Sequence, residues 1–418
     1  MVAGARLIAL ALLWDPAIAQ TAARNAYPSR ATYVPARPTT TVLDVDESGL
    51  YVQLPDGRLM GFTDRVKVGV PEAIARYSTN EGRSWSEPQT LVEFPKGTSG
   101  WTMNNVLLDR HGEIHLVYYK GGNNSGKSLY DQRLDIWHVR SVDGRTRFKP
   151  PKLVWEGYAG ALLSVVQLRS GRILLPFSYL TPRRWRNRGT GFDAFTYMGR
   201  FSSSALYSDD DGDTWRQSPD ELKEATATID ADGGIEPIVI QLKNGVVWML
   251  IRTQDNYFFE SFSKDDGAHW SRPRPTRIMS SDSPPSLTRL KDGRILMLWN
   301  NCLRYPYANG GRHVMHGAVS EDEGRAWRGF REVARSPMVA EPPPPDGDHG
   351  VSSYGVPGLT KEGNIVAALP WPGGPGGKSY LLHVDPSWLY EVRQADDFSK
   401  GLEQWSIFGT KGVEVVVS

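Results

Sequence analysis

Several features that many proteins rely on are scarce in this chain of 418 residues. Its only cysteine is Cys302, which excludes an intramolecular disulfide. The 48 basic residues almost balance the 47 acidic ones, and a net charge of +1 argues against a general role on nucleic acid or at a membrane surface. The apolar run Leu7–Trp14 is too short to span a bilayer, and nothing later in the chain is better suited. The eight histidines show no metal-ligand spacing on an expected strand or helix, so we expect neither a catalytic metal nor another cofactor.

The N-terminus has the features of an export signal. Arg6 precedes the apolar run, and Ala17 and Ala19 form an A-x-A cleavage site. We therefore expect a signal peptide over residues 1–19, an N-terminal segment over 20–44, and a mature protein that works in the periplasm or the medium. The alternative is a buried N-terminal helix, because the basic region is short and an acidic residue follows the apolar run.

Glycine (42), proline (29) and tryptophan (14) are plentiful, which suits many tight turns better than a helical protein. The stretch Gly234–Trp270 shows the pattern most clearly. Apolar and β-branched residues come in runs of about six to eight and are separated by turns that contain glycine, which predicts four consecutive antiparallel strands. Glu236 lies where the first of these strands begins, and Arg252 lies where the second one ends.

Two turn motifs recur along the chain. One is a glycine turn between apolar strands, and the other has the form Ser-x-Asp/Asn-x-Gly-x-x-Trp, in which the side chain of the third residue ties down its own turn and tryptophan covers the base of the hairpin. Six units of four antiparallel strands predict an all-β fold, a six-bladed β-propeller whose radial closure leaves few free sheet edges. The turn glycines are Gly57, Gly112, Gly171, Gly245, Gly293 and Gly363, and the second motif occupies 78–85, 208–215, 263–270 and 320–327, with a degenerate copy at 141–148.

The second motif resembles the Asp-box repeat of the sialidase-like β-propeller family. The resemblance covers roughly residues 45–390 and implies six four-stranded blades joined by Asp-box turns. Asp boxes also occur in propellers that are not sialidases or not enzymes, so they identify the fold better than the reaction. The pattern changes after Tyr390, and residues 391–418 are interpreted as a linker with the stub of a possible lectin-like module.

Two sets of positions, counted from the turn glycines, should meet at one face of the ring. The first strand of a blade begins eight to eleven residues before its turn glycine, at one face of the ring. The second strand returns to that same face about seven residues after the glycine. Both sets are rich in polar and aromatic residues, which predicts a polar rim where a propeller carries its chemistry. The positions after the glycines are Asp64, Tyr119, Ser178, Arg252, Asn300 and Pro370, and those before them are Asn104, Glu236, Asp282 and Tyr354.

The resemblance implies a division of roles at this rim. In a sialidase, arginines bind the substrate carboxylate, an acid protonates the leaving group, and a tyrosine activated by a carboxylate attacks the anomeric carbon. Matched motif by motif, Tyr354 falls on the nucleophile and Glu236 on its activating carboxylate, while Asp64, with Glu72 behind it, is the candidate acid. The candidate substrate-binding residues are Arg252, Arg312, Arg65, Asn104, Asp282 and Asn300.

Each of these residues also has a purely structural interpretation. Glu236 could cap a turn, and Arg252 could pair with it as a tie between blades. Tyr354 could serve only as a stacking surface, Asp64 could merely accompany Arg65, and Asp282 could be a turn residue.

The charge pattern of the chain carries two opposing signals about the ligand. An insertion rich in arginine (Arg183, Arg184, Arg186, Arg188 and Arg200) favours an anionic ligand, because guanidinium groups bind carboxylates through a planar fork. Sialidases, however, open their first blade with an Arg-Ile-Pro segment that supplies a third carboxylate-binding arginine. The corresponding stretch here contains Glu47, which would repel a sugar carboxylate, so another acidic sugar or a neutral one is expected in place of sialic acid.

Three functions remain open on the sequence. The leading one is an exo-acting glycoside hydrolase that releases a terminal sugar, expected to be acidic, from a glycan. The second is a polysaccharide lyase on uronic-acid glycans, for which His313, His316 or His349 together with Tyr354 could act. The third is a non-catalytic carbohydrate-binding propeller. In each case the expected partner is a glycan, with no nucleic acid and no membrane span, and the chain is expected to be a monomer.

Overall fold

The computed structural model describes residues 38–43, 49–95, 101–123, 132–145, 147–182, 199–223, 233–301, 312, 314–335, 357–369 and 379–390. All of these belong to one compact unit, residues 36–392. In the described ranges its regular elements are strands, together with one short 3-10 helix, η4 (Pro386–Tyr390). No helix in the described part of the chain is both long and apolar enough to cross a membrane.

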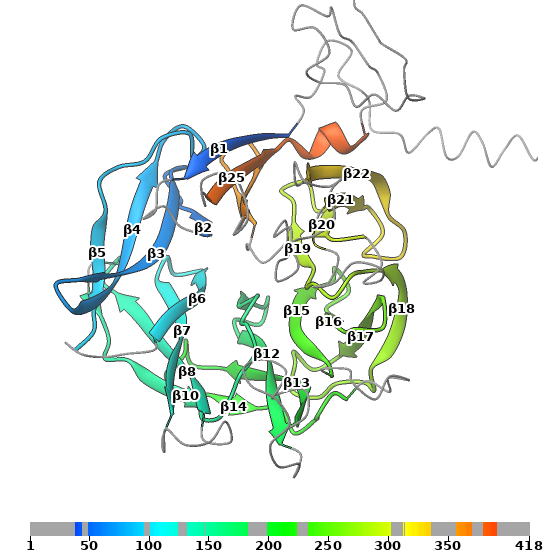
Figure 1. Ribbon diagram of the computed structural model, residues 1–418, viewed down its shortest axis with the longest axis horizontal. Helices are drawn as coiled ribbons and strands as arrows, with labels where there is room; N and C mark the ends of the chain where they lie inside the picture. The colour runs from blue at the N-terminus through cyan, green and yellow to red at the C-terminus, as the bar shows by residue number, and fades with distance from the viewer. Residues whose placement is uncertain are drawn as a thin grey trace, which may run out of the picture. The chain divides into compact units, whose positions relative to one another are not determined.

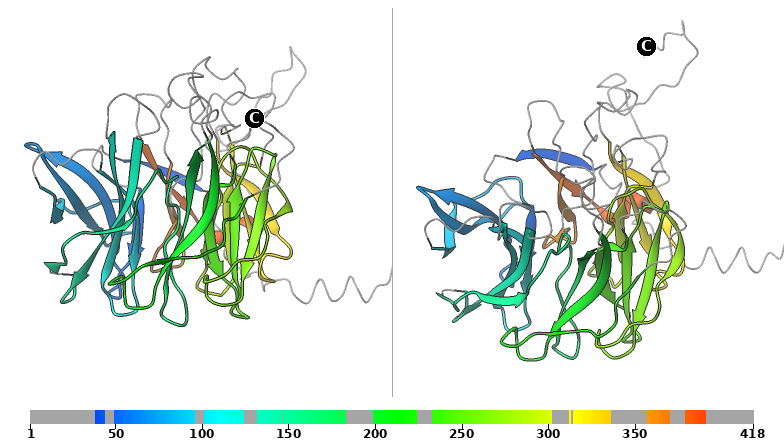
Figure 2. Two further views of the ribbon diagram at one scale, coloured as in Figure 1. Left: turned by 90° about the horizontal axis from the view of Figure 1, so that it is seen from below. Right: turned by 60° about the horizontal axis from the view of Figure 1, so that its bottom comes forward.

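The strands form six antiparallel sheets that stand in a ring around a central axis (Figure 1), and they run roughly along that axis (Figure 2). The predicted all-β, six-bladed propeller is therefore confirmed. Blade 1 is β2 (Leu50–Gln53), β3 (Leu59–Lys67), β4 (Val70–Ser78) and β5 (Gln89–Glu93). Blade 2 is β6 (Trp101–Leu108), β7 (Ile114–Asn123), β8 (Gln132–Val142) and β10 (Lys152–Trp155), with β9 (Arg147–Phe148) paired to β8. Blade 3 is β11 (Val166–Gln167), β12 (Ile173–Pro182), β13 (Gly199–Ser208) and β14 (Arg216–Gln217).

The remaining three blades follow the same order from the axis outward. Blade 4 is β15 (Ile235–Gln241), β16 (Val247–Arg252), β17 (Tyr257–Ser263) and β18 (Arg274–Met279), and blade 5 is β19 (Ser286–Arg289), β20 (Ile295–Trp299), β21 (Val314–Ser320) and β22 (Arg328–Arg335). Blade 6 is β23 (Gly358–Leu359), β24 (Ile365–Leu369), β25 (Ser379–Val384) and, as its outer strand, β1 (Thr39–Leu43).

Each blade is buried on both faces by its neighbours, as β16 shows. All six residues of this strand are buried. Met249 and Ile251 pack in one apolar cluster with Leu174 of blade 3, while Trp248 and Leu250 pack in another with residues of blade 5. Full burial of such a side chain contributes about 1.5–3 kcal/mol. The continuous apolar runs of the sequence are thus explained by sheets that have no solvent-facing side.

The Asp-box turns work as the sequence predicts, and they also set the spacing between blades. In the turn of blade 4, Ser263 Oγ accepts a hydrogen bond from the backbone N–H of Gly267 (2.8 Å), and Asp265 accepts one from the N–H four residues later (2.9 Å). Gly267 has a φ of +84°, and a Cβ atom there would lie 2.5 Å from Leu174 of blade 3. Glycine is therefore needed both for the backbone conformation and for close approach to the preceding blade.

The ring is closed by contacts between the two ends of the propeller. The outer strand of the last blade is β1, which pairs with β25 from Thr39 opposite His383 to Leu43 opposite Ser379. This strand lies inside the segment 20–44 that the sequence analysis left outside the propeller. Closure also involves Glu81 in the Asp box of blade 1, which accepts hydrogen bonds from two side chains of blade 6, Thr360 Oγ1 (2.6 Å) and Asn364 Nδ2 (2.9 Å).

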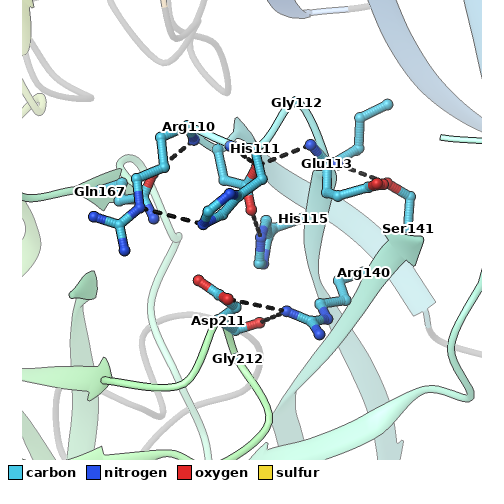
Figure 3. Close-up of polar contacts among 12 residues, drawn as sticks. Arg110, His111, Gly112, Glu113, His115, Arg140, Ser141, Gln167, Asp211 and Gly212 are labelled. Atoms are coloured by element: carbon cyan, nitrogen blue, oxygen red, sulfur yellow. Dashed lines mark hydrogen bonds and ion pairs between the residues drawn. The ribbon is translucent and has the colours of Figure 1, made fainter. Parts of the chain in front are cut away.

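A buried chain of titratable groups, Asp109, His115 and His138, lies where blade 2 meets the Asp box of blade 3. Figure 3 shows His115 of this chain together with Arg140 and Asp211. His115 Nε2 is 3.2 Å from Asp109 Oδ2, and its Nδ1 is 2.9 Å from His138 Nε2. Burial lowers the pKa of His115 against the opposing effect of Asp109, and burial, followed by the nearby His115 and Arg140, lowers the pKa of His138 well below its usual value. Other charges that act on the pair are Asp211, Lys149 and Lys152.

The two buried histidines predict acid-sensitive stability. Because their pKa values are lower in the folded protein than in the unfolded chain, the unfolded chain binds more protons below about pH 6.5. The stability they contribute is present above that pH and is lost as the pH falls. We expect the urea concentration at the midpoint of unfolding to be lower at about pH 5.5 than at about pH 7.5. This decrease should be smaller in His138→Gln than in the wild type or in the control His111→Gln, whose side chain is exposed. An equal fall in all three proteins would contradict this assignment.

Candidate functional site

Polar side chains at the ends of the second strands reach across to the next blade. The hydroxyl of Tyr119 in blade 2 donates to the carbonyl of Gly160, which precedes β11 of blade 3. Ser178 of blade 3 accepts a hydrogen bond at Oγ from the backbone N–H of Glu236 in blade 4 (3.1 Å). Arg252 of blade 4 in turn contacts the residue Asp282 that precedes β19 of blade 5. Two pairs drawn from the two sets of positions, Ser178 with Glu236 and Arg252 with Asp282, therefore meet at the boundaries between blades.

Glu236 is held in an unusual backbone conformation. A β-bulge shifts the register of β15 between Ile235 and Ile238, and within this bulge Glu236 has a φ of 53°, in the left-handed region. Such a conformation costs a residue other than glycine about 1–3 kcal/mol. It places a carboxylate that is only 6% exposed with its Oε2 atom 2.5 Å from Nη1 of Arg252.

Arg252 lies between two carboxylates that come from different blades. Its Nη1 atom contacts Glu236, while Nε and Nη2 are each 2.8 Å from Oδ1 of Asp282. Arg252 is 7% exposed and Asp282 is 9% exposed, so the ion pairs are buried. Gln254, two residues further along the chain, donates from Nε2 to the other oxygen of Asp282 (3.0 Å).

Arg312 completes the group that we call the rim cluster, defined as Glu236, Arg252, Asp282 and Arg312. Its Nη2 and Nε atoms donate to the backbone carbonyl of Asp282 (2.9 and 3.3 Å). Burial by itself raises the pKa of Asp282, but Arg252, with further help from Arg312 and Gln254, outweighs it and holds the pKa below its usual range. Asp282 is therefore ionised at neutral pH, and the two positive and two negative charges of the rim cluster cancel.

The segment around Asp282 is fixed by blade 5. The backbone N–H of Ser281 donates to the carbonyl of Asn300 (3.0 Å), and the side chain of Asn300 donates from Nδ2 to the carbonyl of Val314 (2.7 Å). The hydroxyls of Ser280, Ser281 and Ser283 are buried and have no hydrogen-bond partner in the part of the chain that the structure describes. Buried hydroxyls are rarely left unpaired, so ordered water is expected in this segment.

The candidates from the first blade form a second, separate group. Arg65 on β3 lies opposite Glu72 on β4, and its Nε atom is 3.2 Å from Oε1 of that residue. Glu72 is 2% exposed and also accepts a hydrogen bond from Thr90. Burial raises the pKa of Glu72, whereas Thr90 and Arg65 more than offset this and lower it. A lowered pKa does not suit a proton donor, which leaves the half-buried Asp64 as the better candidate acid.

Several predicted residues lie outside the described part of the chain. They are the nucleophile candidate Tyr354, the acidic residue Glu47, the histidines His313 and His349, and the arginines at 183, 184, 186 and 188. The backbone of Asn104 is described as part of β6, but its side chain is not. His316 is described, and its ring stacks on Phe330 at 4.9 Å with an interplanar angle of 5°.

One residue of the site, Gln254, was not predicted from the sequence. Gln254 orients Asp282, and its position two residues after Arg252 was the only signal that could have pointed to it. The ion pair between Arg252 and Asp282 was not predicted either, because counting from the turn glycines places both residues at the rim but does not show which side chains pair.

A cavity of about 340 Å³ lies along the axis of the ring. Its walls are the inner strands of blades 2 to 5, including Ile238–Gln241 of β15 and Ser286–Arg289 of β19. These stretches follow Glu236 and Asp282 along the chain, so these two residues of the rim cluster lie at or just before the starts of strands that line the cavity. The cluster residues themselves do not line it. Among the described residues, no three histidine, cysteine, aspartate or glutamate side chains are placed to hold a metal ion.

The family model for the BNR repeat-like domain matches residues 64–365, which is more than half of the chain. This protein belongs to the BNR repeat-like domain family. A search of curated protein sequences finds no match. Solved structures with the same fold include a protein of unknown function from Dyadobacter fermentans, with a TM-score of 0.58 and 16% identity over 84% of this chain and 99% of that one.

Two sialidases are also similar to this BNR repeat-like domain. NanB sialidase from Streptococcus pneumoniae has a TM-score of 0.55 and 14% identity over 85% of this chain and 72% of its own. A leech intramolecular trans-sialidase in complex with 2,7-anhydro-Neu5Ac has a TM-score of 0.54 and 14% identity over 86% of this chain and 71% of its own. At such identities the likeness shows the fold of the BNR repeat-like domain and not its reaction.

Removing the central arginine of the rim cluster should destabilise the domain. Arg252→Ala leaves two buried carboxylates without a counter-charge, so we expect the free energy of unfolding to fall by about 3–5 kcal/mol. Arg277→Ala, on the exposed side of β18, should change it by less than about 0.5 kcal/mol. Urea unfolding of the two variants tests this, and similar small losses would show that the ion pairs do not matter for folding.

Proposed function

We propose that this protein is an exported, exo-acting glycoside hydrolase that releases a terminal sugar from a glycan at the mouth of its central channel. The observation that carries this proposal is Glu236, a buried carboxylate held in a strained conformation at the start of an inner strand. Strained, buried ionisable groups concentrate at functional sites, because folding alone gives no reason to keep them. The proposal takes its class of reaction from the sialidases that share this fold.

The proposed reaction distributes its protons among three side chains. The oxygen of Tyr354 attacks the anomeric carbon, and its proton passes to Glu236. The bond from the anomeric carbon to the leaving oxygen breaks, and that oxygen takes a proton from Asp64. Water then replaces the tyrosine oxygen on the sugar, with Asp64 accepting a proton from the water and Tyr354 recovering its own.

One observation favours a non-catalytic sugar-binding propeller as the second candidate. Arg252 forms ion pairs with Glu236 of blade 4 and with Asp282, which precedes blade 5. A purely structural link between the two blades would have the same contacts. The lyase alternative receives less support from the described residues, since the ring of His316 stacks on Phe330 and its Nδ1 atom accepts a hydrogen bond from the backbone of Asn301 (3.3 Å).

Enzyme assays separate these candidates. We expect the wild type to cleave at least one aryl glycoside in a panel of neutral and acidic sugars, and Glu236→Gln to lose about a hundredfold or more in kcat/KM with its circular dichroism unchanged. Tyr354→Phe should lose as much, and the exposed control Glu87→Gln should retain full activity. A product that absorbs in the ultraviolet as an unsaturated uronide would indicate the lyase instead, and full activity in Glu236→Gln would remove this residue from the mechanism.

The export part of the proposal has its own test. When the full chain is expressed in a bacterium with a general secretion pathway, we expect it in the periplasm or the medium with an N-terminus near residue 20. N-terminal sequencing of the recovered protein measures this. A cytoplasmic protein that retains residues 1–19 would contradict it.

A further inference from the structure

The rim cluster contains the two arginines that the family resemblance assigns to a substrate carboxylate, yet both already contact Asp282. Arg252 donates from both Nε and Nη2 to one carboxylate oxygen of this residue, Oδ1, at 2.8 Å, so two of its five N–H donors are directed at this residue of the protein. Arg312 donates its Nη2 and Nε to the carbonyl of the same residue. Within the described residues, Asp282 therefore already takes up donors of both arginines that the resemblance assigns to the acid group of a sugar.

Asp282 is not poised to leave this place. Gln254 holds its second oxygen, and the backbone bonds of Ser281 to Asn300 and of Ser283 to Ser281 fix the segment on either side. Its side chain is about nine-tenths buried, so movement away from Arg252 would either leave a charge without a partner or require the segment to unfold locally. A sugar carboxylate that approached the cluster would meet Asp282 and Glu236 as like charges.

We propose that Asp282 determines specificity by engaging both arginines, Arg252 through its carboxylate and Arg312 through its backbone carbonyl, so that the site takes an uncharged terminal sugar and rejects one that bears a carboxylate. This rests on the proposed glycoside hydrolase function and names its substrate class. The sequence contributes an independent observation, since Glu47 stands where the family resemblance calls for a third carboxylate-binding arginine. Two acidic residues thus replace or cancel the positive charge that an acidic sugar would need.

The test compares the wild type with Asp282→Asn, which keeps the size of the side chain and removes its charge. Hydrolysis is measured on 4-nitrophenyl glycosides of neutral sugars, glucuronic acid and sialic acid, and binding of free glucuronate and N-acetylneuraminate is measured by calorimetry. We expect the wild type to prefer the best neutral glycoside by about a hundredfold and Asp282→Asn to bind at least one free acid about tenfold more tightly. Ser283→Ala, a buried neighbour without charge, is the matched control and should bind the acids like the wild type.

The possible outcomes separate this inference from the proposed function. If no glycoside is cleaved but Asp282→Asn gains affinity for an acid, the hydrolase proposal fails and the role of Asp282 stands. If the wild type binds or cleaves the acidic sugars well, or if Asp282→Asn gains nothing, the inference is overturned whatever the activity. Should Asp282→Asn fail to fold, Asp282→Ser, which matches the flanking serines, takes its place in the same comparison.

Discussion

The fold depends on one constraint, which is that no sheet in the ring has a face left for solvent. The strand β16, buried along its whole length between blades 3 and 5, could not exist in an isolated blade without exposing one apolar face. The blades must therefore approach closely, and the Asp-box glycines allow this, because a side chain at Gly267 or Gly324 would collide with Leu174 or Trp248 of the preceding blade. Radial packing of this kind brings the starts of all inner strands to one end of the axis, and so it creates a site from residues that are distant in sequence.

At that end of the axis the protein keeps features that folding does not favour. Buried ion pairs contribute little net stability, since the cost of removing two charges from water largely cancels their attraction. Glu236 adds backbone strain of about 1–3 kcal/mol to that cost. An apolar contact like that of β16 would join blades 4 and 5 without the free-energy cost of removing charges from water. The combination of strain and buried charge at the start of an inner strand is what the proposed function would explain.

Much of the fold could be predicted from the sequence because its determinants are local. A turn glycine such as Gly245 fixes a hairpin. Counting seven residues from it reaches Arg252, which is the last residue of β16 and pairs with Ile235 at the start of β15. The pairing of β1 with β25 could not be predicted in this way, since it joins Thr39 to His383 with no intervening pattern.

The site was less predictable than the fold, for a related reason. Counting positions brings Glu236, Arg252 and Asp282 to one rim, but it cannot say which atoms pair. That choice depends on the bulge that turns Glu236 into the left-handed region and on the serine segment that holds Asp282. Both are features of backbone geometry at blade boundaries, where no repeat constrains the chain. The nucleophile candidate Tyr354 stays a prediction, because it lies outside the described residues.

The rim cluster also shows why a count of arginines is a poor guide to the charge of a ligand. A guanidinium group has five N–H donors, and carboxylates of the protein can take them as well as a carboxylate of a sugar, as Glu236 and Asp282 do on Arg252. What a ligand meets is the charge that remains after internal pairing, and for Arg252 and Arg312 with Glu236 and Asp282 this remainder is zero. An acidic sugar would gain nothing from such a site and would have to displace a buried, ionised group to enter it. A sugar that offers only hydroxyls avoids that cost, because it can share the outer lone pairs of the same carboxylates without breaking their bonds to arginine.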